Sequence, residues 1–394
     1  MNVKPKNANF RPAFGKRPIY RPRRGAIIPM MAAVIVVLLV MAAFAIDVAY
    51  MELTRTQLKA AADASAKAGV QAMTTSQNST TAINAAIAMA ARNQVNGKAL
   101  TLTSSDIQVG QSIVQSDGSW TFSPNTTPYR AMKVTPSLSA SNANGAVNLF
   151  FGSVLGSSTF TTTTSSVASA YEQEICLVLD RSHSMCFDLS GTMWQYPPPI
   201  NSGYGYDTAP LAGCRWKSLD AAVAQFTSIL NTATSPPRVA VVTWGSDIYD
   251  SHNNLIAAAA TTDLALTTNY TSVNSAVTAH DSVAMYGGTN MSAGMTQGLS
   301  VLTASNVKPY ADKVMVLMTD GAWNAGTDPN TTAQSLKNAG ITVHTITFTT
   351  SGDTSTMSNI ATLTGGKSYY ATDSAGLQQA FQTLAQTLAV VLTQ

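Results

Sequence analysis

Two aspartates and three hydroxyl side chains stand in three short segments of the C-terminal half of the chain. The first segment, DRSHS, holds Asp180, Ser182 and Ser184 at alternate positions, so an extended turn would point all three to one side. Thr289 follows two glycines in YGGTN, and Asp320 stands in TDG. Carboxylate and hydroxyl oxygens are the ligands that hard divalent cations prefer. The sequence therefore predicts a cation site with Mg²⁺ as the expected metal, and Mn²⁺ or Ca²⁺ as the alternatives.

Other interpretations of the first segment were weighed against metal binding. The two serines could cap the start of a helix while Asp180 accepts hydrogen bonds from loop amides. Aspartyl-phosphate chemistry of the haloacid-dehalogenase type needs a second acid two residues after the first, where this chain has Ser182. A serine hydrolase needs a G-x-S-x-G turn, which DRSHSM does not provide. We therefore expect a binding protein and not an enzyme.

The elements that must position these residues alternate between strands and helices after residue 172. Continuous apolar runs are typical of parallel strands that are buried on both faces. Such runs, at 175–180, 238–244, 312–320 and 341–348, alternate with helical patterns at 217–231, 291–302, 330–340 and 375–392. This order predicts an α/β fold, a doubly wound and mostly parallel sheet, whose ligands bind at the carboxyl ends of the strands.

The three segments resemble the metal-ion-dependent adhesion site (MIDAS) of the von Willebrand factor type A family. Its pattern is D-x-S-x-S, then a distant Thr, then Asp in a TDG turn, and DRSHS, GGTN and TDG occur here in that order. The resemblance covers residues 172–394 and implies a Rossmann-like domain. It also implies that the serines and the threonine bind the cation directly, and that the aspartates bind it directly or through water. An open coordination position would accept a carboxylate from a partner protein. A degenerate domain that keeps the fold without the metal is the alternative.

The N-terminal region combines a basic tail with an apolar segment. Residues 1–24 contain eight Lys and Arg and no acid, which leaves 15 basic against 20 acidic residues in the rest of the chain. We therefore expect no nucleic-acid binding. Residues 26–46 carry no charge and are long enough to cross a bilayer as a helix. The positive-inside rule predicts a retained anchor, residues 25–46, with a cytoplasmic N-terminus. A cleaved signal peptide is the alternative.

The same region resembles the TadE/TadG-like proteins of Flp (tight adherence) pilus assembly. The resemblance rests on RRGAIIPMMAAVIVVLLVMAAFAIDVAY, RTQLKAAADASAKAGVQA and NLFFGSVLGSSTFTTTTSSVASA, and it covers residues 20–170. It implies a single-pass protein of the bacterial inner membrane that works with pilus or secretion-apparatus components, with its C-terminal domain periplasmic or extracellular.

Composition predicts the elements that follow the anchor. Residues 47–73 are rich in Ala, Leu, Gln and Lys without Pro, so the helix should continue past the membrane as part of alanine-rich helices over 47–99. Thr- and Val-rich alternating runs predict a β-rich spacer over 100–171.

One position departs from the pattern of processed pilins. Prepilin substrates carry Glu five residues after the glycine, whereas Met30 stands five residues after Gly25. This favours a retained anchor in a metal-dependent, adhesion-type protein. The alternative is a minor pilin-like structural subunit, cleaved between Gly25 and Ala26, with a metal-free type A domain.

Two cysteines flank an insertion directly after the first polar segment. Cys186 and Cys214 enclose a Pro-, Gly- and Tyr-rich stretch, and an exported domain lies in an oxidising compartment, so we predict a disulfide between them. Two free thiols are the alternative. Cys176 lies within an apolar run and is expected to be a small buried hydrophobe. Aromatic and amide side chains near the metal turn either form a rim that contacts a partner or pack among themselves: Trp194, Tyr196, Tyr204, Tyr206, Trp323 and Asn324.

Overall fold

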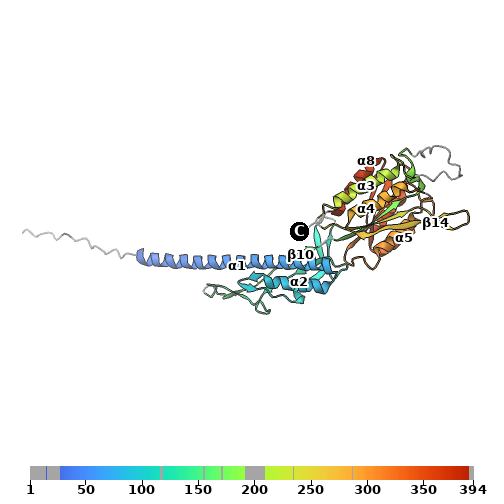
Figure 1. The fold of residues 1–394 in the computed structure, drawn as a ribbon. Helices are drawn as coiled ribbons and strands as arrows, with labels where there is room; N and C mark the ends of the chain where they lie inside the picture. Colours follow the sequence, from blue (N-terminus) through green and yellow to red (C-terminus); the bar gives the residue numbers. More distant parts are fainter. Residues whose placement is uncertain are drawn as a thin grey trace, which may run out of the picture.

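The protein is elongated, with a long helix at one end and an α/β domain at the other (Figure 1). The computed structural model describes residues 15, 27–115, 119–153, 156–169, 172–190, 209–233, 235–285 and 287–389. A small module lies beside the second half of the long helix, between the apolar end and the α/β domain (Figure 1). The basic tail and most of the insertion lie outside the described residues.

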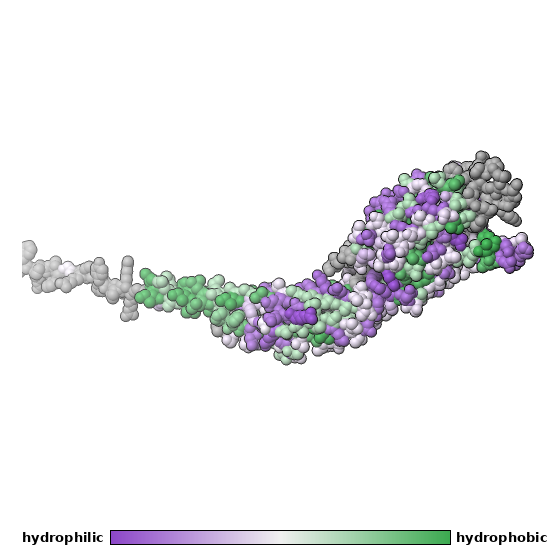
Figure 2. Space-filling view, viewed as in Figure 1, coloured by the Kyte–Doolittle hydropathy of each residue, from purple (hydrophilic) through white to green (hydrophobic). Residues whose placement is uncertain are grey.

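Helix α1 (Ile27–Ser76) runs for 50 residues without interruption. Its first twenty residues are apolar and exposed on all sides, and the helix is long and apolar enough to cross a membrane (Figure 2). From Asp47 onward, one face packs on α2 (Ser79–Arg92), which contributes alanines at every fourth position. Alanine and glycine allow the two helices to approach closely. The buried residues of this contact are Leu58, Ala61, Ala62, Ala66, Gly69, Val70, Ala82, Ala86 and Ala90.

The small module is β-rich, as the sequence predicts. Its main sheet is antiparallel, in the order β10 (Ser166–Ser169), β5 (Ala131–Val134), β3 (Ile107–Val114), β4 (Trp120–Pro124). This sheet packs on α1 through β10 and β5. Three two-stranded pairs and one 3₁₀ turn complete the module: β1 (Gln94–Val95) with β2 (Lys98–Ala99), β6 (Ser137–Leu138) with β9 (Thr162–Thr163), β7 (Val147–Asn148) with β8 (Thr159–Phe160), and η1 (Ser104–Asp106).

The C-terminal domain contains a six-stranded sheet. Its order is β15 (Ala260–Thr267), β12 (Arg238–Trp244), β11 (Gln173–Asp180), β16 (Asp312–Thr319), β17 (Ile341–Phe348), β18 (Ser368–Ala371). The strands are parallel except β15, which pairs antiparallel with β12. All eight residues of the central strand β11 are buried. The prediction of a mostly parallel α/β sheet is confirmed.

Helices cover both faces of this sheet, because alternate residues of the central strands point to opposite sides. Leu177 and Leu179 of β11 pack with one helix set, and Cys176 and Val178 pack with the other. Both core clusters consist of residues after 172, so the domain contains its own core. The first set is α3 (Arg215–Leu230), α4 (Tyr270–Thr278) and α8 (Ser374–Ala389), and the second is α5 (Met291–Leu302), α6 (Pro329–Asn338) and α7 (Thr354–Thr364). The 3₁₀ turns η2 (His183–Cys186) and η3 (Ala279–Ser282) and the hairpin β13 (Ile248–Tyr249)–β14 (Leu255–Ala257) lie in the connections.

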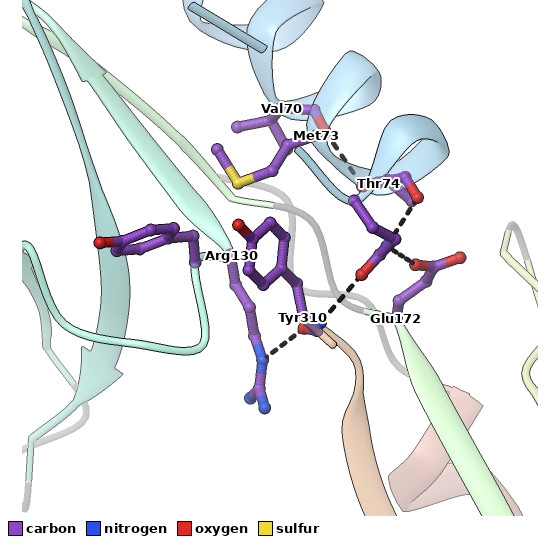
Figure 3. Close-up of a pocket in the computed structure, with 8 residues that line it drawn as sticks. Val70, Met73, Thr74, Arg130, Glu172 and Tyr310 are labelled. Carbon is purple, nitrogen blue, oxygen red and sulfur yellow. Dashed lines mark hydrogen bonds between the residues drawn. The ribbon is translucent and has the colours of Figure 1, made fainter. Parts of the chain in front are cut away.

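Polar contacts join the end of α1 to the C-terminal domain (Figure 3). Directly after α1, Gln77 donates from Nε2 to Glu172 Oε2 at 2.9 Å and accepts from the Tyr310 backbone N–H at 2.8 Å. Arg130 of the β-rich module donates from Nε to the Tyr310 carbonyl at 3.0 Å and forms an ion pair with Asp312. These contacts link the helix, the module and the domain at one place.

His344 of β17 makes the stability of the domain dependent on pH. Burial, and then the charge of Lys367, lowers the pKa of His344 to about 4, and its Nδ1 accepts a hydrogen bond from the Lys367 backbone N–H at 3.1 Å. The unfolded chain takes up this proton below its ordinary pKa of about 6.5, whereas the folded domain does so only near 4. The free energy of unfolding should therefore fall by about 3 kcal/mol as the pH drops from about 6.5 to about 4.

Urea unfolding of residues 172–394 at a series of pH values checks this, with His344→Asn as the matched control. Asparagine keeps an acceptor for the Lys367 N–H but does not titrate. The variant should lose less stability than the wild type over the same pH interval. Equal losses in the two proteins would contradict the assignment.

Candidate metal site

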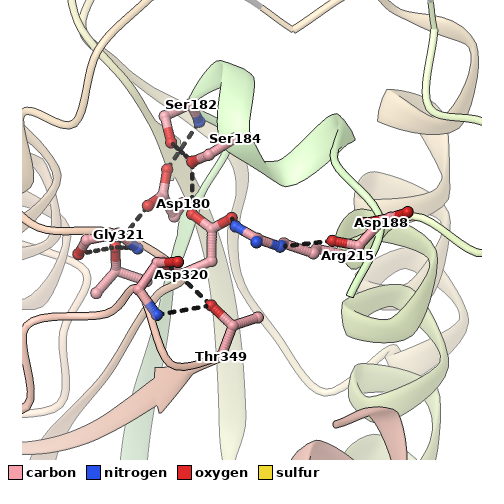
Figure 4. A network of polar contacts seen from close by, with 10 residues as sticks. Asp180, Ser182, Ser184, Asp188, Arg215, Asp320, Gly321 and Thr349 are labelled. Atoms are coloured by element: carbon pink, nitrogen blue, oxygen red, sulfur yellow. Dashed lines mark hydrogen bonds and ion pairs between the residues drawn. The ribbon is translucent and has the colours of Figure 1, made fainter. Parts of the chain in front are cut away.

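Four of the five predicted site residues meet at the carboxyl edge of the central sheet (Figure 4). Asp180 is the last residue of β11, and Asp320 directly follows β16, its parallel neighbour. Ser182 and Ser184 lie in the turn that continues into η2. Parallel pairing brings the ends of the two strands together, so residues 140 positions apart in the chain become neighbours.

Hydrogen bonds connect four of the five predicted ligands. Asp180 accepts from the Ser182 N–H at 2.7 Å and, through its second oxygen, from Thr319 Oγ1 at 2.6 Å. The Ser182 and Ser184 hydroxyl oxygens lie 3.1 Å apart. Ser184 Oγ donates to Asp320 Oδ1 at 2.7 Å. The side chains of the turn therefore converge on the two carboxylates, as their alternate spacing predicts.

Thr289, the fifth predicted ligand, lies near Gly321, as Ser184 does. A Cβ atom built on Gly321 would be 3.5 Å from Thr289 Oγ1 and 3.8 Å from Ser184 Oγ, so both hydroxyls border the same glycine. Gly287, at φ +84°, accepts from the His183 N–H at 3.2 Å and so joins the threonine loop to the serine turn. The loop therefore brings Thr289 to the edge where the other four residues lie.

Asn324 has a positioning role that the sequence did not indicate. Its Oδ1 accepts from the Thr289 N–H at 2.9 Å, and its own N–H donates to the Thr289 carbonyl at 3.1 Å. Trp323 is partly buried against the core under α5, α6 and α7. A partner-contacting role for Asn324 and Trp323 stays a prediction, and Trp194, Tyr196, Tyr204 and Tyr206 lie outside the described residues.

The two carboxylates are completely buried, which makes their charges costly. Burial, and then the nearby charge of Asp320, raises the pKa of Asp180 to about 7, although hydrogen bonds from Thr319 and Ser182 act in the opposite direction. Burial also raises the pKa of Asp320, against the opposing effect of Arg215. A divalent cation between the two groups would stabilise both as carboxylates.

A buried arginine that the sequence did not indicate lies beside the site. Arg215, the first residue of α3, is 2% exposed and donates from Nη1 to Asp320 Oδ2 at 2.7 Å. Its Nε donates to the Asp188 carbonyl at 3.1 Å, and its guanidinium lies 5.7 Å from the Phe187 ring centre. Asp320 thus offers one oxygen to Ser184 and the other to Arg215 (Figure 4). The sequence signal that could have identified Arg215 is its position, as a charged residue at the start of a helix with many apolar residues.

The donor set fits a hard divalent cation. The candidate oxygens are two carboxylates and three hydroxyls, and Arg215 compensates only one of the two negative charges. In the described part of the chain, no three His, Cys, Asp or Glu residues come together as a metal-binding group. A site completed by hydroxyls instead suits Mg²⁺, Mn²⁺ or Ca²⁺.

The structure does not show the predicted disulfide between Cys186 and Cys214, since both are free thiols in it. Both side chains are buried in the core under α3. Burial, and then the neighbouring Cys214, raises the pKa of the Cys186 thiol to about 12, and burial also raises the pKa of Cys214. Cys176 is buried within β11 as predicted.

The fold and the arrangement of the three polar segments define a domain of the von Willebrand factor type A class. The family model for the von Willebrand factor type A domain matches residues 174–383, and the chain belongs to this family. Its N-terminal part matches two further models: putative Flp pilus-assembly TadE/G-like, over residues 25–72, and putative Tad-like Flp pilus-assembly, over residues 52–168. The chain is therefore a Tad-like protein with a C-terminal type A domain.

The chain also has partial similarity to solved structures. Proximal thread matrix protein 1 from the mussel byssus, with a zinc-occupied MIDAS motif, is 18% identical, with a TM-score of 0.39, over 56% of this chain and 46% of that one. The pilus adhesin SpaC from Lactobacillus rhamnosus GG is 15% identical, with a TM-score of 0.41, over 72% and 34%. A von Willebrand factor type A protein from Catenulispora acidiphila is 18% identical, with a TM-score of 0.39, over 66% and 46%. The chain thus spans less than half of each of these structures. No curated protein matches the chain in sequence.

Arg215 should weaken cation binding because it places a positive charge on Asp320. Arg215→Met keeps a long apolar stem and removes the charge, so we expect Mg²⁺ to bind at least about tenfold more tightly, which corresponds to about 1.4 kcal/mol. Breaking the buried ion pair should also lower the melting temperature of the metal-free domain, and Mg²⁺ should raise that temperature more than in the wild type.

Isothermal titration and thermal unfolding of residues 172–394 measure both effects. Arg215→Lys is the control, because it keeps the charge and should retain wild-type affinity more closely than the methionine variant. Unchanged or weaker Mg²⁺ binding in Arg215→Met would show that the arginine does not oppose the cation.

Proposed function

We propose that this protein is a membrane-anchored, metal-dependent protein-binding component of Flp (Tad) pilus biogenesis or surface adherence. The observation that carries this proposal is the pair of buried carboxylates, Asp180 and Asp320, beside three hydroxyls at one sheet edge. We assign Asp180, Ser182, Ser184, Thr289 and Asp320 as the metal ligands. Mg²⁺ is the expected cation, and Mn²⁺ or Ca²⁺ are the alternatives.

A bound cation would supply an acceptor position for a carboxylate of a partner protein. The chain's own residues hold the oxygen ligands in place: Thr319 orients Asp180, Asn324 orients Thr289, and Arg215 orients Asp320. Binding of this kind needs no proton transfer and no nucleophile, so the proposed role is recognition and not catalysis. Pilus or secretion-apparatus proteins that expose a carboxylate are the proposed partners.

The exposed apolar half of α1 supports a single-pass anchor in a bacterial inner membrane. The basic tail places the N-terminus in the cytoplasm, so the type A domain lies in the periplasm or outside the cell. We propose this division of the chain: tail 1–24, transmembrane helix 25–46, alanine-rich helices 47–99, β-rich spacer 100–171, and type A domain 172–394 with the insertion 186–214.

The buried Arg215 favours a second candidate function. It compensates one of the two buried charges without a metal, and this is what a metal-free domain would need. In that case the protein is a minor pilin-like or envelope subunit, and its type A domain has a structural role.

Metal titration separates the two candidates. Mg²⁺ and Mn²⁺ should bind residues 172–394 saturably, and Asp180→Asn should weaken binding at least about 100-fold while leaving the fold intact, because a charged ligand is lost without a change of size. Isothermal titration, with circular dichroism as the fold check, provides the measurement.

Asp353→Asn is the matched control for this experiment. Asp353 caps α7 through a hydrogen bond from the Thr356 N–H, and asparagine can make the same bond. The affinity of the Asp353→Asn variant for Mg²⁺ should equal that of the wild type. Well-folded wild-type protein that binds neither metal would favour the structural subunit.

A further inference from the structure

Asp47 is the first charged residue after the apolar segment of α1. Its carboxylate is buried, although the segment directly before it is exposed. The residue is 2% exposed. Its Oδ1 accepts from the Phe150 N–H at 2.9 Å, and its Oδ2 accepts from the Phe151 N–H at 3.1 Å. Backbone amides therefore stabilise the charge in place of water. The same bonds fix residues 149–153, here called the Phe loop, against α1.

The Phe loop exposes two large apolar rings at this point. Phe150 is 66% exposed and Phe151 is 40% exposed. Tyr50, one turn beyond Asp47, packs on Phe150 with ring centres 4.9 Å apart. Exposed neighbouring phenylalanines are unfavourable in water, whereas aromatic side chains gather where a membrane protein enters the headgroup region.

The length of α1 places these rings at a membrane surface. Ile27 to Ile46 is twenty residues, or about 30 Å of helix, which equals the thickness of the hydrocarbon core. An exposed ion pair between Glu52 and Arg55 marks the water side, five residues after Asp47 or about 7.5 Å farther along the helix. Asp47, to which the Phe loop is hydrogen-bonded, lies between the end of the apolar segment and this ion pair. The Phe loop is therefore at the depth of the lipid headgroups.

We propose that the Phe loop is a membrane-seating surface, with Phe150 and Phe151 embedded in the headgroup region of the bilayer that α1 crosses. Asp47 positions the loop by binding its amides. This inference rests on the membrane anchor of the proposed function and is independent of the metal site. A bilayer is the occupant because the loop is bonded to Asp47, directly after the exposed apolar segment of α1 that is long enough to cross a membrane (Figure 2).

Quenching of tryptophan fluorescence by brominated lipids tests the proposal on the full chain. The Phe150→Trp variant is reconstituted in phosphatidylcholine vesicles that carry bromine near the headgroup end of the acyl chains. The emission of the wild-type protein, which comes from its five native tryptophans, is subtracted as the baseline. The emission that Trp adds at position 150 should be mostly lost in these lipids. Tyr249→Trp is the matched control, because Tyr249 is a similarly exposed aromatic, at 52%, on the hairpin of the distant type A domain. Its added emission should be retained.

A third variant separates this proposal from the anchor itself. Phe44 is exposed within the apolar half of α1, so Phe44→Trp should be quenched wherever the helix spans the bilayer. Quenching at position 44 with none at 150 would overturn the seating surface and leave the anchor intact. Quenching at neither position would overturn both.

The positioning role of Asp47 has its own test. Asp47→Ala in the Phe150→Trp background removes both acceptors, and quenching should fall toward the Tyr249→Trp level. Asp47→Asn keeps one acceptor oxygen and should restore part of the quenching. Mg²⁺ affinity, measured in the same vesicles, should not change in either variant. Full quenching in Asp47→Ala would show that the loop reaches the membrane without Asp47.

Discussion

Two like charges on neighbouring strands are the constraint around which the type A domain is organised. The parallel register of β11 and β16 pairs Leu179 with Met318, so Asp180 at the end of β11 and Asp320 directly after β16 are directed to the same buried edge. The negative charge of each buried carboxylate must then be compensated by hydrogen-bond donors or by a positive charge. Thr319, the serine turn and Arg215 provide it with short hydrogen bonds and one ion pair. The helices on both faces exclude water from this edge and so give each of these contacts a larger energetic effect.

Much of this arrangement was predictable because it follows from local patterns. The continuous apolar runs at β11, β12, β16 and β17 identify buried parallel strands, and the aspartates at the ends of the runs of β11 and β16 must then lie at one edge. The helices α3, α5, α6 and α8 follow the predicted ranges to within a few residues. The long helix α1 was predicted as well, since alanine, leucine and lysine continue the helical pattern past the membrane segment.

The features that were not predicted depend on partners far away in the chain. Arg215 meets Asp320 across 105 positions, and a local pattern can single out the arginine but not its partner. Strand β15 is Thr-rich, half-exposed and antiparallel, and the short helices α4 and α7 lie outside the apolar runs on which the prediction relied. The disulfide was predicted from chain positions and an oxidising compartment, and neither reveals that both thiols are buried in the core.

The continuity of α1 has a mechanical consequence. A pull on the type A domain would reach Gln77 through its bonds to Glu172 and Tyr310, and would then act along the axis of a single unbroken helix. Axial tension on α1 loads its packing against α2 in shear, so many contacts share the force and none opens first. The helix would therefore transmit tension from the type A domain to the membrane as a stiff rod that extends little under load.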